Sequence, residues 1–126
     1  MKPKTIKVLH WTVTGLFSVF MLMAGIAELM QSEEGKEIMR HLGYPLHVLI
    51  VLGAGKILGA IALLQTKFRT IKEWAYAGFT FNFIGACVAR ADAGDSTALI
   101  ISPLLFWAGL LLSYFFWKKY AALKSK

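Results

Sequence analysis

The sequence predicts an all-α integral membrane protein: a single domain, residues 1–126, folded as a four-helix bundle with both termini in the cytoplasm. Hydrophobic residues make up 57% of the chain and charged residues 17%, whereas about 25% of a typical soluble domain is charged. The apolar residues are gathered into four segments, each close to the roughly 20 residues that a spanning helix needs. Basic residues are gathered in the tails and the middle connection, the distribution expected around membrane spans.

The first span is predicted at residues 8–31, because residues 8–27 contain no Asp, Glu, Lys or Arg. A cleaved signal peptide is the alternative, since three lysines precede this segment and Gly25-Ile26-Ala27 could serve as a cleavage site. The apolar run, however, is longer than the roughly 7–15 residues of a signal-peptide core. Cleavage would also remove one wall of the bundle, so we expect the segment to remain as a helix.

The connection after the first span, residues 32–44, is the longest one and is expected on the outer side of the membrane. Ser32 and the acidic residues behind it predict the start of a short helix at the membrane surface. Gly43 is expected to end that helix, and Pro45 suits the first turn of the next one. The second span is therefore predicted at residues 45–66.

The third and fourth spans are predicted at residues 72–92 and 98–117. The third has a shorter apolar core, residues 74–89, and reaches spanning length only together with its charged flanks. The short connection before it makes the second and third spans antiparallel neighbours. Three residues that can cap a helix precede the fourth span: Asp95, Ser96 and Thr97.

The net charge is +7, and the distribution of the basic residues along the chain indicates a membrane topology rather than a nucleic-acid-binding surface. Ten basic residues lie in the three segments that share one side of a four-span protein: Lys2, Lys4, Lys7, Lys67, Arg69, Lys72, Lys118, Lys119, Lys124 and Lys126. The opposite side carries three basic residues and five acids. Because basic residues accumulate on the cytoplasmic side of membrane proteins, both termini are expected there, and no nucleic-acid partner is expected.

The cysteine and histidine residues predict neither a disulfide nor a metal site. Cys87 is the single cysteine, so no intramolecular disulfide can form, and we expect it to be a small packing residue. His10 lies near the inner interface and His47 near the outer one, too far apart to share a haem. No spacing of His and Cys typical of a metal site is present.

Lys56 lies in the middle of the second span. A lysine at such a depth costs roughly 2.5–3.5 kcal/mol on insertion scales, which indicates a polar site inside the bundle. Lys56 lies roughly 16 Å below Pro45 at the helical rise per residue. The first span runs outward and the second inward, and helical side chains lean toward the N-terminus of their own helix. Glu28 and Lys56 are therefore expected to converge in the outer half of the bundle.

Three residues of the third predicted span extend this pair into a polar cluster, which comprises Glu28, Lys56, Asn82, Arg90 and Asp92. The charges nearly balance, and buried charges are tolerated in that way. The two basic residues would contact an oxygen or an anion, and the two acids would hold or exchange protons. Asn82 would orient the ligand.

The cluster has three competing interpretations: an ion-pair network that fixes helix packing, a ligand or catalytic site, or a proton path. The third is disfavoured because only His10 continues a chain of titratable groups toward the cytoplasmic side. Small residues at helical spacing form stripes beside the cluster and predict packing seams. The glycines expected to pack against neighbouring helices are Gly25, Gly55, Gly59, Gly78 and Gly85.

The chain resembles the DoxX-like family of small four-helix bacterial membrane proteins over nearly its whole length. The most specific segments lie in the second and third predicted spans: Gly55-Lys56-Ile57-Leu58-Gly59-Ala60 and Glu73-Trp74-Ala75-Tyr76-Ala77-Gly78. His10-Trp11 with Thr14-Gly15 is similar to the family's first span. The resemblance places Lys56 at the family's lysine position in the second span.

This resemblance implies a multi-pass protein of the bacterial inner (plasma) membrane and an oxidoreductase component, since the family takes its name from a subunit of a quinone-linked sulfur oxidoreductase. The residues themselves show no cofactor ligand set, and a quinone is the cofactor that the resemblance allows. The leading hypothesis is thus an outer-half site around Lys56 for a small apolar or quinone-like molecule. The alternative is a non-enzymatic scaffold or helper subunit. Expected partners are the lipid bilayer, a small apolar ligand, and a second copy or another membrane subunit.

Overall fold

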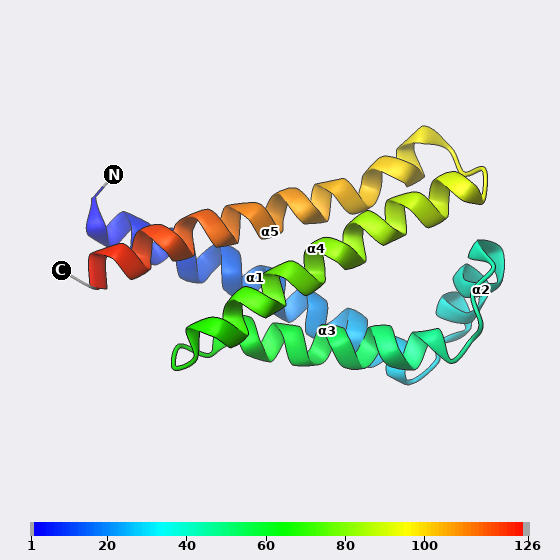
Figure 1. The fold of residues 1–126 in the computed structure, drawn as a ribbon, viewed down its shortest axis with the longest axis horizontal. Helices are drawn as coiled ribbons and strands as arrows, with labels where there is room; N and C mark the ends of the chain where they lie inside the picture. The colour runs from blue at the N-terminus through cyan, green and yellow to red at the C-terminus, as the bar shows by residue number, and fades with distance from the viewer. Residues whose placement is uncertain (1, 125–126) are drawn as a thin grey trace.

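The computed structural model describes residues 2–124 and is all-helical (Figure 1). It contains five helices in chain order: α1 (Pro3–Leu29), α2 (Glu33–Leu42), α3 (Val48–Leu64), α4 (Arg69–Asp92) and α5 (Thr97–Lys124). Both ends of the chain lie at one end of the bundle, and α2 lies at the other (Figure 1). We call these the terminal end and the α2 end.

The four long helices pack as two pairs, α1 with α3 and α4 with α5, and α1 also packs on α5. Figure 1 shows α3 and α4 leaving their short connection and diverging toward the α2 end, where α2 lies between them. The short helix packs against both α3 and α4. It therefore covers the opening that this divergence leaves.

Length and composition give two helices the properties of membrane spans. Within residues 2–124, α1 and the Thr97–Leu123 part of α5 are long and apolar enough to cross a bilayer. The apolar helix α3 has 17 residues, and the 24 residues of α4 include charged residues near both ends. The described part of the chain is thus helical throughout, and the two helices that reach spanning length are the first and the last.

The surface helix α2 begins and ends as its sequence predicts. The Ser32 hydroxyl accepts a hydrogen bond from the Gly35 backbone N–H at 3.2 Å, which satisfies one of the unpaired donors of the first turn. Gly43 ends the helix with φ of 81°, a conformation that glycine adopts without steric cost. Met39 is buried beneath the helix.

The helix after it begins later than the sequence predicts. Pro45 does not form the first turn of α3: it lies in a preceding turn, in which the Val48 N–H donates to the Pro45 carbonyl at 3.1 Å. The other long helices extend beyond the predicted spans, since α1 starts at Pro3 and α5 runs to Lys124. At the start of α5, Ser96 is the capping residue whose hydroxyl accepts from the Leu99 N–H, at 3.4 Å.

The interior of the bundle combines aromatic rings with hydroxyl groups. Phe17 and Phe79 pack edge to face, and Tyr76 stacks on Trp117. In the same interior, Ser113 forms hydrogen bonds with Thr14 at 2.6 Å and with Tyr76 at 2.7 Å. Three helices, α1, α4 and α5, are joined by these hydroxyls. Many of the side chains that face outward are large and apolar.

Two helix contacts depend on glycine. A Cβ added at Gly53 would lie 2.7 Å from the Gly25 carbonyl oxygen, and one added at Gly25 would lie 2.8 Å from the Gly53 oxygen. Real Cβ atoms do not approach that closely, so these two glycines let α1 and α3 come together. A Cβ at Gly59 would meet the Phe79 ring at 2.7 Å. Gly53 was not among the glycines predicted to pack.

The prediction that Gly55, Gly78 and Gly85 pack against neighbouring helices is wrong. A Cβ at Gly55, Gly78 or Gly85 would meet no atom within 4 Å. The reason is the divergence of α3 from α4: the stripes on their facing sides do not close on each other. Gly55 and Gly78 instead line an open groove between the two helices.

Candidate functional site

An ion pair joins the last turn of α1 to the middle of α3. The Lys56 ammonium donates to Glu28 Oε1 at 2.5 Å, and the two side chains are 16% and 19% exposed. The close backbone contact of Gly25 with Gly53 positions the pair, because Glu28 follows the first glycine by one turn and Lys56 follows the second. A bulkier residue at either glycine would separate the helices and lengthen the ion pair.

Glu28 has hydrogen-bonding capacity that the pair does not use. Its second oxygen, Oε2, is buried and has no hydrogen-bond partner among the described residues. A carboxylate accepts several hydrogen bonds, and an unsatisfied buried oxygen is unusual in a folded protein. This oxygen could therefore accept a hydrogen bond from a ligand or hold a proton.

Lys56 and Asn82 stand between two hollows in the bundle. One hollow, of about 190 Å³, lies among α1, α4 and α5 toward the α2 end and is lined by Met21, Phe83 and Phe106 as well as by this pair. The other is a groove of about 360 Å³ between α3 and α4, which Lys56 and Asn82 also line. A molecule in either hollow could therefore reach the ammonium and the amide.

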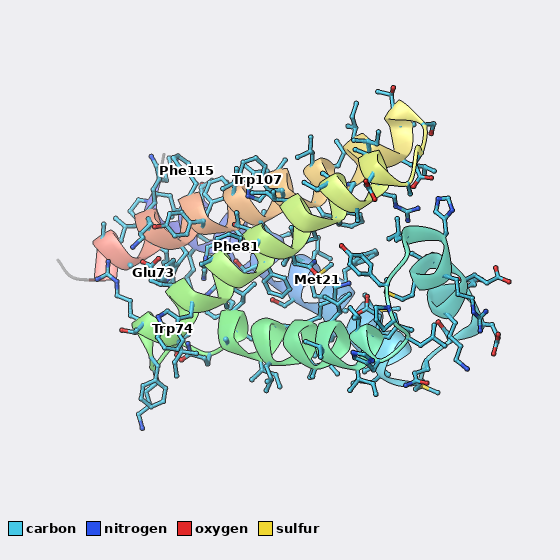
Figure 2. All side chains as sticks on the ribbon, turned by 45° about the vertical axis from the view of Figure 1, so that its right-hand side comes forward. Met21, Glu73, Trp74, Phe81, Trp107 and Phe115 are labelled. Atoms are coloured by element: carbon cyan, nitrogen blue, oxygen red, sulfur yellow. The ribbon has the colours of Figure 1, made fainter. Side chains whose placement is uncertain are left out.

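The groove between α3 and α4 offers few polar groups. Its wall is made of small and apolar residues with Lys56 and Asn82 as its polar groups, and it runs toward the terminal end as far as Ile71 and Trp74. Figure 2 shows Trp74 near the α3–α4 connection and Met21 inside the bundle. The sequence predicted a site only in the outer half, so the groove adds a second approach to Lys56 from the opposite direction.

Arg90 belongs to a separate cluster at the α2 end. Its Nη1 donates to Asp95 Oδ2 at 3.1 Å, and the other oxygen of Asp95 bonds to His41 of α2. The hydrogen bond from His41, with Arg90 adding to it, lowers the pKa of Asp95 below its usual value of 3.8. The predicted partner Asp92 is exposed, so the carboxylate that holds Arg90 is Asp95.

The predicted five-residue cluster is thus divided into two. Lys56 pairs with Glu28 and lines the same two hollows as Asn82. Arg90 lies about two turns beyond Asn82 on α4, roughly 12 Å at the helical rise. Because α4 diverges from α3 over this distance, Arg90 is carried away from Lys56 and toward α2. His41 was missed in the sequence because 54 residues separate it from Asp95. Asp95 was seen only as a helix cap.

A third polar group lies between the ion pair and the terminal end. Thr14, Ser113 and Tyr76 share hydrogen bonds in the core, and Trp107 donates to Thr80 at 3.3 Å. The hydroxyl of Ser18, one turn beyond Thr14, is buried and has no hydrogen-bond partner among the described residues. The contact among Thr14, Tyr76 and Ser113 could not be seen in the sequence, because the three residues lie on three different helices.

The described residues offer no metal site: no three His, Cys, Asp or Glu side chains are grouped in a way that could hold an ion. A ligand at Lys56 would instead meet one ammonium, one amide, one carboxylate oxygen and mostly apolar walls. Such a set suits a molecule with an oxygen acceptor on an apolar body, since polar groups fix orientation while apolar walls supply contact area.

Comparison with known proteins identifies the family of the chain. The sequence profile of the DoxX-like family matches residues 12–113, a range that contains Glu28, Lys56 and Asn82 and the whole of α2, α3 and α4. No curated protein and no solved structure matches the chain. Since the profile covers most of the sequence, the chain belongs to the DoxX-like family.

Proposed function

We propose that this protein spans the bacterial inner membrane four times, with both termini in the cytoplasm, and binds a small apolar or quinone-like molecule at Lys56 as a component of an oxidoreductase. The observation that carries the proposal is the position of Lys56 and Asn82 between two hollows. A lysine needed only for packing would be enclosed by its partner and neighbouring side chains. Lys56 is paired with Glu28 and still reaches open space on two sides.

The surface of the bundle supports its placement in lipid. Large apolar side chains are well exposed on all four long helices, among them Leu16 at 70%, Leu58 at 68%, Phe81 at 77% and Leu105 at 69%. Soluble proteins rarely expose contiguous apolar surface of this kind. The hydroxyl groups of Thr14 and Ser113, in contrast, are buried in the interior. In a bilayer this arrangement is favourable, because lipid covers the apolar side chains and the hydroxyls bond to one another.

The donor set around Lys56 fits a quinone. Such a ring accepts hydrogen bonds at its carbonyl oxygens and takes up two electrons and two protons when it is reduced. The Lys56 ammonium and the Asn82 amide would each donate to a carbonyl oxygen and hold the ring in a fixed orientation. The free oxygen of Glu28 would hold a proton close to the same place. The apolar walls would exclude water from the ring.

The alternative is a scaffold in which the ion pair only joins α1 to α3. The direct bond between Lys56 and Glu28 favours it, and the hollows beside the pair favour ligand binding. The two functions make different predictions about a variant without the Lys56 charge. A scaffold loses only stability when Lys56 is replaced, whereas a binding site also loses its ligand.

The test compares Lys56→Met with the wild type by thermal unfolding in detergent and by mass spectrometry of small molecules that remain bound after purification. We expect the variant to remain folded and to lose a bound quinone or similar apolar molecule. Lys118→Met is the matched control, because Lys118 also pairs with a glutamate at 2.5 Å but lies away from both hollows. Unfolding of Lys56→Met without any ligand in the wild type would establish the scaffold.

Membrane insertion is tested separately by washing membranes with alkaline carbonate, which removes peripheral proteins. The wild type and both variants should stay in the membrane fraction. Cysteine labelling of Cys-free protein with single cysteines placed at position 67 or 94 then reports which end faces the cytoplasm, since the two positions lie in connections at opposite ends of α4. Labelling of position 94 from the cytoplasmic side would contradict the proposed orientation.

A further inference from the structure

The two hollows beside Lys56 share polar residues but differ in their other walls. Lys56 and Asn82 line both of them. The larger hollow, the groove between α3 and α4, is otherwise lined by small and apolar residues along both helices. Phenyl rings from α1, α4 and α5 line the smaller one. A single molecule held by Lys56 and Asn82 would therefore meet two different surfaces.

The phenyl rings of the smaller hollow stack on one another. The centroid of the Phe106 ring lies 5.2 Å from that of Phe20 and 6.1 Å from that of Phe83, and both pairs are stacked. Aromatic rings attract one another at such distances. The hollow, of about 190 Å³, thus suits a flat ring whose polar atoms face Lys56 and Asn82.

The groove is long and opens on the outside of the bundle. From Ile71 to Asn82 it follows α4 for roughly 16 Å at the helical rise. Three of its lining residues are also well exposed: Val51 at 67%, Leu58 at 68% and Trp74 at 75%. In the membrane placement proposed above, lipid lies against these side chains. The groove therefore leads from the hydrocarbon layer of the membrane to the Lys56 ammonium.

Polar and apolar residues are separated along the groove. Lys56 and Asn82 lie toward its α2 end, whereas Ile71 and Trp74 lie near the α3–α4 connection (Figure 2). The residues that line it between these two places are small or apolar, Ala75 among them. Apolar walls with a few polar groups at one place fix the orientation of a ligand. This order matches a molecule with a polar head and an apolar tail.

We propose that the ligand at Lys56 is a membrane-dissolved molecule with an apolar tail, and that it enters sideways from the bilayer between α3 and α4. Its flat ring lies in the hollow beside Phe83 and Phe106, and its tail lies in the groove and extends toward Trp74. The inference rests on the ligand site proposed above and specifies the class of molecule that this site takes. A small water-soluble ligand would make no use of the groove. A phospholipid acyl chain would fill the groove without using Lys56.

The experiment locates the tail by photolabelling the full chain in lipid nanodiscs. The probe is a benzoquinone with a decyl tail that ends in a diazirine, and labelled peptides are identified by mass spectrometry. We expect the label near Trp74 and Ala75 on α4 and near Leu58 on α3, because these residues line the groove away from Asn82. Lys56→Met should lose most of this labelling, because the ring is no longer held.

Two further probes separate the tail from ordinary lipid and from the ring. A phospholipid that carries the diazirine in its acyl chain reports lipid that enters the groove without a head at Lys56, and it should label the wild type and Lys56→Met equally. The same benzoquinone without a tail reports the ring alone, through its retention by the wild type and by Lys56→Met.

Ala75→Leu and Ala77→Leu make the same change inside and outside the groove. Ala75 lines the groove about two turns before Asn82, roughly 10 Å away, whereas Ala77 is exposed outside it. Ala75→Leu should lower labelling by the tailed quinone about fivefold, which corresponds to roughly 1 kcal/mol, and should leave retention of the tail-less quinone unchanged. Ala77→Leu should change neither. The Tm of each variant reports whether it is folded, and the wild-type labelling pattern tests the proposal without either variant.

Three results would overturn the proposal. Labelling by the tailed quinone that is unchanged in Lys56→Met would show that the groove holds ordinary lipid chains. A label at the α2 end would show that the tail extends in the opposite direction. Equal labelling of folded Ala75→Leu and wild type would show that the tail lies outside the groove. Failure of the Lys56 site itself would appear instead as equal retention of both quinones by the wild type and Lys56→Met, so the two proposals fail in different measurements.

Discussion

Lys56 forms one ion pair, with Glu28, and faces two hollows in the bundle. The carboxylate of Glu28 lies at 2.5 Å and supplies the counter-charge, while both side chains remain less than a fifth exposed. Removing one member of such a pair leaves an uncompensated charge in a poorly hydrated place, and this costs more than removing both. The pair therefore holds α1 on α3 only as long as it is complete.

Glu28→Gln tests this dependence. We expect the free energy of unfolding to fall by about 3 kcal/mol, because the Lys56 ammonium is left without a counter-charge. The double variant Glu28→Leu with Lys56→Met should recover most of that loss. Chemical unfolding in mixed detergent measures both values. A loss in the double variant equal to the sum of the losses in Glu28→Leu and Lys56→Met alone would show that the two residues act independently.

The sequence predicted the pair of Glu28 and Lys56 because residue numbers give two quantities: the depth of each residue in the membrane and the direction in which its side chain leans along the helix. Glu28 and Lys56 lie on adjacent antiparallel segments, so counting residues gives their relative height. Arg90 could not be placed in the same way, since its partner depends on the angle at which α4 leaves α3. That angle arises from side-chain packing among all five helices, and the spacing of polar residues does not encode it.

Glycines of α3 lie in two different surroundings, a close backbone contact with α1 and an open space. Gly25 and Gly53 face each other where α1 crosses α3, and their backbones touch. Gly55, only two residues from Gly53, faces open space because successive helical residues point about 100° apart. The sequence shows both glycines on the same apolar helix and cannot distinguish them without knowing which face meets α1. The structure makes that distinction testable.

Gly53→Ala and Gly55→Ala form a matched pair on one helix. The first adds a Cβ that would lie 2.7 Å from the Gly25 carbonyl oxygen, and overpacking of this kind costs about 1–3 kcal/mol. The second adds a Cβ in open space and should stabilise the helix by about 0.5–1 kcal/mol, the difference in helix propensity. Unfolding midpoints of both variants check the signs. Similar changes in both would place the α1–α3 contact elsewhere.

The groove between α3 and α4 allows a second comparison. Gly78 and Gly85 are both on α4 and both face open space, but only Gly78 lines the groove. Gly78→Leu should fill part of the groove and reduce retention of the ligand bound at Lys56, whereas Gly85→Leu should retain it. Neither variant should lower Tm, because leucine is the better helix former. Equal retention in both would exclude the groove as part of the site.

The two helix pairs and α2 form an arrangement in which the shortest helix joins elements far apart in the sequence. The pairs diverge toward the α2 end, and α2 lies across the gap (Figure 1). Its His41 bonds to Asp95 in the connection between α4 and α5, and Asp95 also holds Arg90 of α4. The fold class and the start and end of α2 followed from local sequence patterns. The closure of the gap did not, because it depends on a contact across 54 residues.

This closure should depend on pH through Asp95. The pKa of Asp95 is lowered in the folded protein, mainly by the hydrogen bond with His41 and further by Arg90. The contribution of Asp95 to stability is therefore complete above the unfolded pKa of 3.8. It is lost as the pH falls through the lower pKa of the folded protein. We expect the wild type to lose stability as the pH falls from neutral to below 3.8. Asp95→Asn should lose less over the same range, from a lower starting point. Asp92→Asn is the control, since Asp92 is exposed on the same segment. Thermal unfolding across this pH range measures the difference. If Tm falls equally with pH in the wild type and in Asp95→Asn, α2 is held in place by its apolar contacts rather than by Asp95.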